Sequence, residues 1–363
     1  MSDSAALPPP GAPSQRSVAV AVAGALALTA IVVTGLAWAK WLPYASKVDT
    51  LNLTGEWDGG SMLMASDGAP SLAAAWDFAT TYTKAVWRAL LVSLLVAAAV
   101  DALVSRRWLV RLLSRSSTWG QAGTGAVLAL PSMMCTCCTA PITVTLRRSG
   151  APVAAVVGHW LGNPLLNPAV LVFLFLVAPW QWGVTRLAVG IVVVLVAAVI
   201  TSEVSRRRDG SESPSESPTV ATDEPAPALS ELPARFVRSF WRISRVLVPE
   251  YALVVLIVGG FSGWLARFTE LTGTGGLAAL VIAAAVGTLL VIPTGGEIPV
   301  LIGLSAVGAS AGLLGVLLIT LPALSVPSMV MVARALSVRV TVVAALTVAG
   351  GGLVAAGVLA TMS

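Results

Sequence analysis

The sequence predicts an all-α polytopic membrane protein with two inverted-topology repeats, each containing a re-entrant or broken helix hairpin, plus one extra N-terminal transmembrane helix. Three observations predict this fold. Of the 363 residues, 56% are hydrophobic and 11% are charged, which is far too apolar for a soluble domain of this length. Apolar runs long enough to span a bilayer recur between clusters of arginine. The proline and glycine pattern of residues 128–172 also recurs in residues 289–330.

Composition excludes several classes of protein. The net charge of +5 comes from short basic clusters beside apolar runs, which is typical of membrane orientation signals and not of nucleic-acid binding. The three cysteines lie in no long polar segment, so a secreted disulfide framework is excluded. We expect no enzyme activity and no cofactor. The expected partners are the lipid bilayer and a small-molecule or ion substrate, with no nucleic acid, and a homo-oligomer is left open.

The N-terminal region divides into three parts. Residues 1–16 are rich in proline and serine and are predicted to be disordered. Residues 17–39 form an apolar transmembrane helix, with Lys40 and the neighbouring tryptophans at the membrane interface. Its apolar core is longer than that of a signal peptide, so we expect a retained helix and not a cleaved signal. Residues 40–80 carry five acidic residues and are predicted to form an outer polar loop.

The first repeat is predicted at residues 82–204, and its topology depends on the segment 121–146. If that segment crossed the membrane once, Arg147, Arg148 and the later arginine triplet would lie outside, against the positive-inside tendency. We therefore predict a hairpin that enters and returns on the same side, turning near residues 135–141. The other spans of this repeat are expected at residues 82–104, 152–178 and 184–202.

Residues 205–240 are rich in serine, proline and acidic residues and are predicted to be a flexible cytoplasmic linker. The second repeat follows at residues 245–361. It is expected to contain a hairpin at 277–307 and spans at 246–266, 309–332 and 340–359. On this layout 16 of the 22 lysines and arginines face the cytoplasm, as do the N-terminus and the linker of this cytoplasmic-membrane protein. The six on the outside are Lys40, Lys47, Lys84, Arg88, Arg186 and Arg267.

The two repeats are related by one constant offset. Pro141 and Pro299, Gly150 and Gly308, and Pro164 and Pro322 are each separated by 158 positions. The layout places the two repeats in opposite orientations, and inverted repeats of this kind hold their site near the bilayer midplane, between the halves.

A cluster of sulfur-containing residues is the first candidate site. Met133, Met134, Cys135, Cys137 and Cys138 lie within six positions, at the predicted turn of the first hairpin. Soft thiolates select soft ions, so the three cysteines are candidate ligands for a metal or for a thiophilic metalloid substrate. Two other interpretations remain open: the cysteines could pack as small hydrophobic residues, and Cys135 with Cys138 has the spacing of a redox-active dithiol.

Glu297 is the second candidate. It lies in the apolar tip of the second hairpin, where a carboxylate is costly and suggests a proton carrier or cation ligand, or else a structural cap of the next helix. Asn163 and Asn167 place two amides one helical turn apart and could line a substrate path or join helices. His159 is expected to be structural. The candidate hinge residues at the helix breaks are Pro141, Pro164, Pro168, Pro293, Gly295, Gly296 and Pro299.

Three short motifs carry a resemblance to a known family. They are Cys-x-Cys-Cys-x-x-Pro at residues 135–141, Arg-Ser-Gly-Ala-Pro at 148–152, and Pro164 followed by Asn167-Pro168. Together they resemble the predicted permease family of the ArsP/YraQ type over residues 82–361. The resemblance implies an integral-membrane permease, and some relatives export trivalent organoarsenicals through cysteine thiols. The second repeat departs from the pattern, because it has no cysteine and Ser325-Val326-Pro327 replaces the Asn-Pro pair.

These observations predict a secondary permease that exports a small thiophilic substrate, a metalloid or soft metal species, through a midplane thiol site. Cys135, Cys137 and Cys138 would bind the substrate together with Asn163 and Asn167, and Glu297 would couple transport to protons. Two alternatives are retained. One is a membrane thiol-disulfide oxidoreductase that uses Cys135 and Cys138, and the other is a membrane scaffold subunit that transports nothing alone. No G-x-x-x-x-G-K-[ST] loop is present, so an ATPase would have to be a separate chain.

Overall fold

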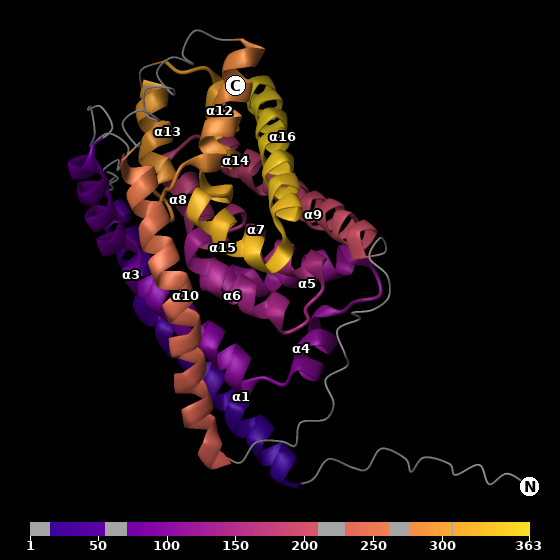
Figure 1. The fold of residues 1–363 in the computed structure, drawn as a ribbon. Coiled ribbons are helices and arrows are strands. Elements are labelled where there is room, and N and C mark those ends of the chain that lie inside the picture. The colour runs from indigo at the N-terminus through magenta and orange to yellow at the C-terminus, as the bar shows by residue number, and fades with distance from the viewer. Residues whose placement is uncertain (1–14, 55–70, 210–228, 261–275, 307) are drawn as a thin grey trace, which may run out of the picture.

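The computed structural model describes residues 15–54, 71–209, 229–260, 276–306 and 308–363. Within these ranges the chain is helical and forms no strand, which confirms the predicted all-α class (Figure 1). The first half contains α1 (Gln15–Leu36), the π-helical segment η1 (Ala37–Trp41), α2 (Leu42–Thr54), α3 (Leu72–Leu103), α4 (Arg106–Leu113), α5 (Thr118–Ala129), η3 (Leu130–Ser132), α6 (Thr136–Arg148), α7 (Val153–Leu165), α8 (Pro168–Val177) and α9 (Trp180–Asp209). The second half contains η5 (Leu229–Glu231), α10 (Leu232–Gly260), α12 (Leu277–Leu289), α13 (Glu297–Ala306), α14 (Ala311–Ala323), α15 (Val326–Leu336) and α16 (Val338–Met362).

Six helical segments in the described ranges are long and apolar enough to cross a membrane. They are Val22–Thr54, Leu72–Leu103, Val153–Val177, Trp180–Arg207, Leu232–Gly260 and Val338–Met362. A seventh is formed if α14 and α15, which are bent by 54° at their junction, count as one broken span. The chain is therefore a multi-pass membrane protein. The short apolar helices α12 and α13 occupy the position of the second predicted hairpin.

Two of the predicted boundaries are wrong. The outer loop was expected over residues 40–80, but the first helix continues through η1 and α2 to Thr54, and α3 already begins at Leu72. Ser71 caps α3, with its hydroxyl accepting a hydrogen bond from the Ala74 amide at 3.1 Å. Only residues 55–70 of this segment lie outside the described residues.

The predicted linker is shorter than expected for a similar reason. Within residues 205–240, α9 extends to Asp209 and α10 begins at Leu232, so helix occupies both ends. Glu203 pairs with Arg206 and Arg207 one turn further along α9, which supports this helical end. The remaining linker residues 210–228, and residues 1–14 of the predicted disordered N-terminus, lie outside the described residues.

The two halves contain the same order of helices at a constant spacing. Helix α14 begins 158 positions after α7, and α16 begins 158 positions after α9. The same turn also ends α6 and α13. Gly150 (φ 91°) donates its N–H to the Arg147 carbonyl, and Gly308 (φ 83°) donates to the Ser305 carbonyl, each at 3.0 Å. Only glycine adopts this backbone conformation without strain, which explains why glycine recurs at this position in both halves.

The halves interlock and do not form separate domains. Helix α3 of the first half packs along α10 of the second, and both run side by side through the lower part of Figure 1. Helix α9 packs against α16, and α6 packs against α15. The junction between the halves therefore runs through the centre of the molecule, beside the helix breaks.

Helices α5 and α7 approach each other unusually closely. A Cβ atom at Gly125 of α5 would lie 2.0 Å from the Ala155 carbonyl oxygen of α7, and one at Gly158 would lie 2.3 Å from the Ala122 oxygen. Small residues of this kind allow membrane helices to gain van der Waals contact where the hydrophobic effect supplies no attraction. The pair forms a rigid support for the break that follows α5.

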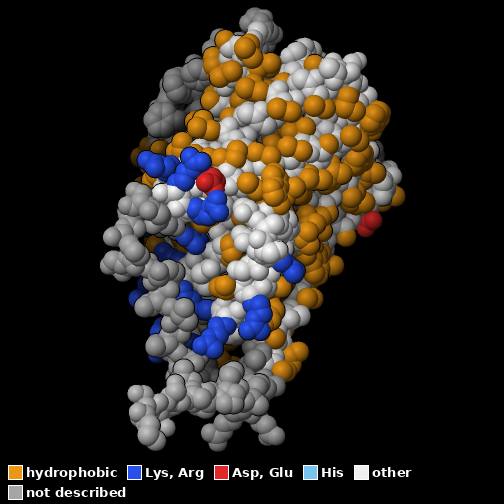
Figure 2. All heavy atoms as spheres, turned by 90° about the vertical axis from the view of Figure 1, so that its right-hand side faces the viewer, with side chains coloured by type: hydrophobic (Ala, Val, Ile, Leu, Met, Phe, Trp, Pro, Cys, Tyr) orange, Lys and Arg blue, Asp and Glu red, His pale blue; other side chains and the backbone are white. Residues whose placement is uncertain are grey.

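The surface separates into an apolar part and a basic part. Figure 2 shows hydrophobic side chains over the upper part of one face and lysine and arginine side chains gathered below them. Exposed apolar residues of α9 and α16, such as Val192, Val342 and Leu346, suit contact with lipid. The basic side chains mark one end of the molecule.

Candidate functional site

The break between η3 and α6 lies in the expected region, just before the turn predicted at residues 135–141. The η3 segment ends at Ser132, Met133 adopts a left-handed conformation (φ 48°), and Cys135 is the N-cap of α6. A left-handed non-glycine residue is strained and persists only when its surroundings hold it there. The side chain of Asn163 on α7 does this: its Oδ1 accepts hydrogen bonds from the Ser132 hydroxyl and from the Met134 amide at 3.0 Å.

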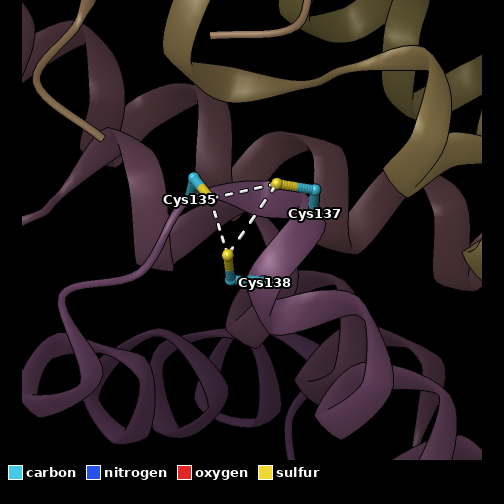
Figure 3. Close-up of side chains that lie close together, drawn as sticks. All are labelled: Cys135, Cys137 and Cys138. Atoms are coloured by element: carbon cyan, nitrogen blue, oxygen red, sulfur yellow. Dashed lines mark hydrogen bonds between the residues drawn. The ribbon is translucent and has the colours of Figure 1, made fainter. Parts of the chain in front are cut away.

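The three thiols converge at this break (Figure 3). The Sγ of Cys135 lies 3.0 Å from that of Cys137 and 3.1 Å from that of Cys138, and the last two are 3.9 Å apart. These separations are well above the roughly 2.05 Å of a disulfide, and all three cysteines are free and buried. One donor atom from each residue lies within 4.8 Å of the others, so the cluster can offer three soft ligands to a single ion.

The surroundings of the thiols come from both halves of the chain. Tyr82 of α3, which is fully buried, places its hydroxyl 3.0 Å from the Cys137 Sγ, and its ring lies 6.4 Å from that of Tyr251 on α10. Thr136 contacts Ser325 of α15 through their hydroxyls at 3.3 Å. The cluster thus lies at the junction of the halves, and sequence analysis identified neither tyrosine as part of the site.

The two asparagines occupy different positions. Both polar atoms of the Asn163 side chain form hydrogen bonds around the break. Its Nδ2 donates to the Thr139 hydroxyl at 3.0 Å, and its Oδ1 accepts from Ser132 and Met134. Asn167 caps α8 by accepting hydrogen bonds from the Ala169 and Val170 amides, and its buried Nδ2 has no hydrogen-bond partner among the described residues. His159, expected to be structural, is buried with its Nε2 3.3 Å from the Thr139 hydroxyl.

Replacing Asn163 by alanine is expected to loosen the thiol cluster. The Ser132 hydroxyl and the Met134 amide lose their acceptor on Asn163, and the Thr139 hydroxyl loses a donor, at a cost of about 1–3 kcal/mol, so the break should open more often. Alkylation of the three cysteines by a maleimide should accelerate by roughly fivefold or more. Asn167→Ala is the matched control: it removes a helix cap for a cost of about 1 kcal/mol and should leave the alkylation rate unchanged. Equal rates in both variants would contradict the role of Asn163.

Glu297 is the first residue of α13 and forms an ion pair that the sequence did not reveal. Its Oε1 lies 2.8 Å from the NH1 of Arg186 on α9, and both side chains are buried, at 2% and 0% exposure. The contact is one of charge, since the two atoms lack hydrogen-bond alignment. Arg186 also donates to the Pro164 carbonyl at 2.9 Å and to that of Leu165 at 3.4 Å, which are left free where α7 ends. Arg186, one of the six basic residues predicted on the outer side of the membrane, is therefore buried inside the protein.

The candidate hinge residues fall at helix breaks with two exceptions. Pro164 and Pro168 flank the α7–α8 break, while Pro293 and Gly295 (φ 82°) lie with Gly296 in the turn before α13. Pro141 lies inside α6, and Pro299 lies in the first turn of α13, so neither interrupts its helix. A first-turn proline lacks only an N–H that would be unpaired anyway. The missing N–H of Pro141 leaves the Cys137 carbonyl without its helical partner.

The N-terminal helical segment contacts both breaks. The Trp41 indole donates to the Pro131 carbonyl at 2.8 Å, and the Tyr44 hydroxyl donates to the Met133 carbonyl at 3.5 Å. Lys40 donates to the Tyr44 hydroxyl at 3.2 Å and to that of Thr294, before α13, at 3.3 Å. Lys40 is only 9% exposed, so its side chain packs inside the protein. This segment is part of the site and not a peripheral anchor.

A multi-pass helical bundle with helix breaks in both halves and polar groups buried at the breaks is the architecture of a membrane transporter. The comparisons with known proteins agree. The model of the predicted permease family ArsP_1 matches residues 71–361, so the chain belongs to this family. It is also similar to the UPF0718 protein YraQ of Escherichia coli (strain K12), with 34% identity over 327 residues that cover 90% of this chain and 92% of that protein. No solved structure matches.

Proposed function

We propose that this protein is a secondary permease that exports a small thiophilic species, a metalloid or soft metal ion, through the thiol cluster of Cys135, Cys137 and Cys138. The observation that carries the proposal is the convergence of three buried Sγ atoms at a helix break. Cysteines that only fill space have no need to face one another, whereas three converging thiols suit a soft ion. Membership of a permease family supports transport as the use of this site.

The two repeats are proposed to be inverted, at residues 82–204 and 245–361, with the thiol cluster near the midplane. Helices in equivalent positions pack on each other, α3 on α10 and α9 on α16, which is what a two-fold relation between the halves produces. The ends of α6, α9 and α15 carry Arg147, Arg206 and Arg334. Arginines at these ends support a cytoplasmic position for them, for the N-terminus and for the linker.

Glu297 is proposed to couple transport to protons. Its carboxylate is buried and joins the second half to α9 of the first through Arg186. If Glu297 takes up a proton, the ion pair loses its attraction and the halves lose one of their connections, which would link protonation to a rearrangement around the site. Asn167, with its unpaired Nδ2, is the better of the two asparagines for contact with the substrate.

Transport into everted membrane vesicles tests the proposal. Wild-type vesicles should accumulate at least one of a trivalent arsenical and Cu(I), and Cys135→Ser, Cys137→Ser and Cys138→Ser should each reduce the uptake by on the order of 10–100-fold, because each removes one ligand. Thr143→Ser, a small change at a buried position of the same helix, should transport normally. Normal uptake by a variant lacking all three thiols would refute the thiol site.

A membrane thiol-disulfide oxidoreductase is the second candidate, favoured by the 3.1 Å between the Cys135 and Cys138 sulfurs. The two functions differ in their need for Cys137. A dithiol formed by Cys135 and Cys138 should keep a measurable disulfide potential in Cys137→Ser, whereas three-ligand transport should fail in that variant. A pair that never oxidises in native membranes would exclude the oxidoreductase.

A further inference from the structure

A cavity of about 360 Å³ lies beside the thiol cluster, between the N-terminal helical segment, α3 and the turn before α13. It is lined by residues of 39–47, 84–89 and 292–300, and none of the three cysteines lines it. A space of this size accommodates a small organic ligand. The cavity is therefore separate from the thiol site and is built partly from the other helix break, the one before α13, through Pro293, Thr294 and Gly295.

The charged side chains of the cavity all have the same sign. Lys40, Lys47, Lys84 and Arg88 line it, and no acidic residue is among the lining residues in the described part of the chain. The Arg88 guanidinium is held over the Trp38 and Trp87 rings, 5.4 and 5.6 Å from their centroids. Cations gathered in a hollow with apolar walls focus a positive potential that attracts anions.

Lys40 is a nearly buried cation in the wall of the cavity. Its ammonium is nearly buried, its hydrogen-bond partners are the neutral hydroxyls of Tyr44 and Thr294, and no described carboxylate pairs with it. A buried charge without an opposite charge is costly. Lys40 belongs to the π-helical segment η1, and such segments occur frequently at functional sites. A negatively charged ligand would supply the missing charge.

Tyr44, which lines the cavity, connects it to the helix break that carries the thiols. Tyr44 bonds Lys40 on one side and the Met133 carbonyl, in the break before α6, on the other. The wall of the cavity is therefore joined by hydrogen bonds to the break that carries the thiols.

We propose that the cavity binds an anionic group of the transported species, so that the substrate is a thiophilic compound carrying a negative charge, such as a carboxylate-bearing trivalent arsenical or soft-metal complex. The soft atom is held by the thiols, and this part rests on the proposed function. The anion preference of the cavity stands on its own charges and can be tested without the thiols.

The first experiment compares two matched probes, phenylarsine oxide and its 4-carboxy derivative, by titration of the purified protein in nanodiscs. Both offer the same trivalent arsenic, and only one carries a charge. Wild type should bind the carboxylate probe about tenfold more tightly. The double variant Lys84→Gln/Arg88→Gln, which changes two exposed side chains far from the helix breaks in sequence, should bring this preference below about threefold without weakening the neutral probe. Arg111→Gln, an exposed arginine of α4 outside the cavity, is the control.

The second experiment measures the potential of the cavity without arsenic. Ala85 is exposed and lines the cavity, so Ala85→Cys is made in a variant whose three native cysteines are serine. This cysteine is treated with two methanethiosulfonates, one bearing a sulfonate and one bearing a trimethylammonium group, and each rate is divided by the rate of the same reagent with a free thiol. The normalised rate of the sulfonate reagent should be at least about tenfold higher than that of the trimethylammonium reagent. Adding Lys84→Gln and Arg88→Gln should remove most of the difference.

The outcomes separate the two proposals. Cysteine-dependent binding of both probes without preference for the carboxylate would overturn the anionic substrate and leave the thiol permease standing. If both arsenic probes bound equally well without the three cysteines, and the sulfonate reagent still modified Ala85→Cys faster, the thiol permease site would be overturned and the anion cavity supported. Equal rates for the two methanethiosulfonates at Ala85→Cys would overturn the anion cavity itself.

Discussion

Gly125→Ala is expected to destabilise the folded protein by about 3 kcal/mol. The new Cβ would lie 2.0 Å from the Ala155 carbonyl oxygen and 2.8 Å from its carbon, which are backbone atoms and cannot rotate away. Helices α5 and α7 would have to separate. Because Asn163 lies on α7 and holds the break that follows α5, the separation should also disturb the thiol cluster.

Thermal unfolding in detergent, followed by size-exclusion chromatography, measures this effect. The apparent midpoint of Gly125→Ala should fall by roughly 6–12 °C. Gly123→Ala is a matched control two residues away on the same helix, where a Cβ meets nothing within 4 Å. Alanine is the better helix former, so the control should be unchanged or slightly more stable. Similar losses in both variants would mean that the close approach of α5 and α7 is not what the glycine permits.

The fold could be predicted largely from apolar runs and from the distribution of arginines. The positive-inside tendency required the segment 121–146 to turn back, and the structure breaks it at Met133, next to the predicted turn. The position of the break was harder to assign, because Pro141 suggested it but lies within α6. A helix tolerates the hydrogen bond lost at proline where neighbouring helices surround it. What interrupts the chain is the amide of Asn163, which lies on another helix.

The site was predictable only where its residues are close in sequence. Cys135, Cys137 and Cys138 form one cluster in four positions, and their spacing on the first turn of a helix brings the sulfurs together. Lys40, Tyr82 and Arg186 lie on other helices and contact the two helix breaks or the thiols. In the sequence alone, each of them is typical of a residue at the membrane surface. Arg186 and Lys40 were assigned to the outside by charge counting, which cannot detect that Glu297 and Thr294 are their partners.

Arg186→Gln is expected to cost about 3–5 kcal/mol, because it leaves the buried carboxylate of Glu297 without an opposite charge. It also weakens the donation to the Pro164 and Leu165 carbonyls at the end of α7. Glu297→Gln should cost less, since Arg186 keeps both carbonyl partners. The double variant removes both charges and should be more stable than Arg186→Gln alone by at least about 1.5 kcal/mol. Additive losses in this double-mutant cycle would contradict a direct ion pair.

The same variants test whether Glu297 carries the coupling proton. In everted vesicles, uptake by wild type should fall when the proton gradient is collapsed, whereas Glu297→Gln, which cannot exchange a proton at that position, should show slow uptake that no longer responds to the gradient. Binding of the substrate to the thiols should remain. Glu203→Gln is the control, because it removes a carboxylate that lies in solvent and pairs with the exposed Arg206 and Arg207 of its own helix. A gradient response that survives in Glu297→Gln would leave the Arg186–Glu297 pair as a structural connection between α9 and α13 and move the coupling to another group.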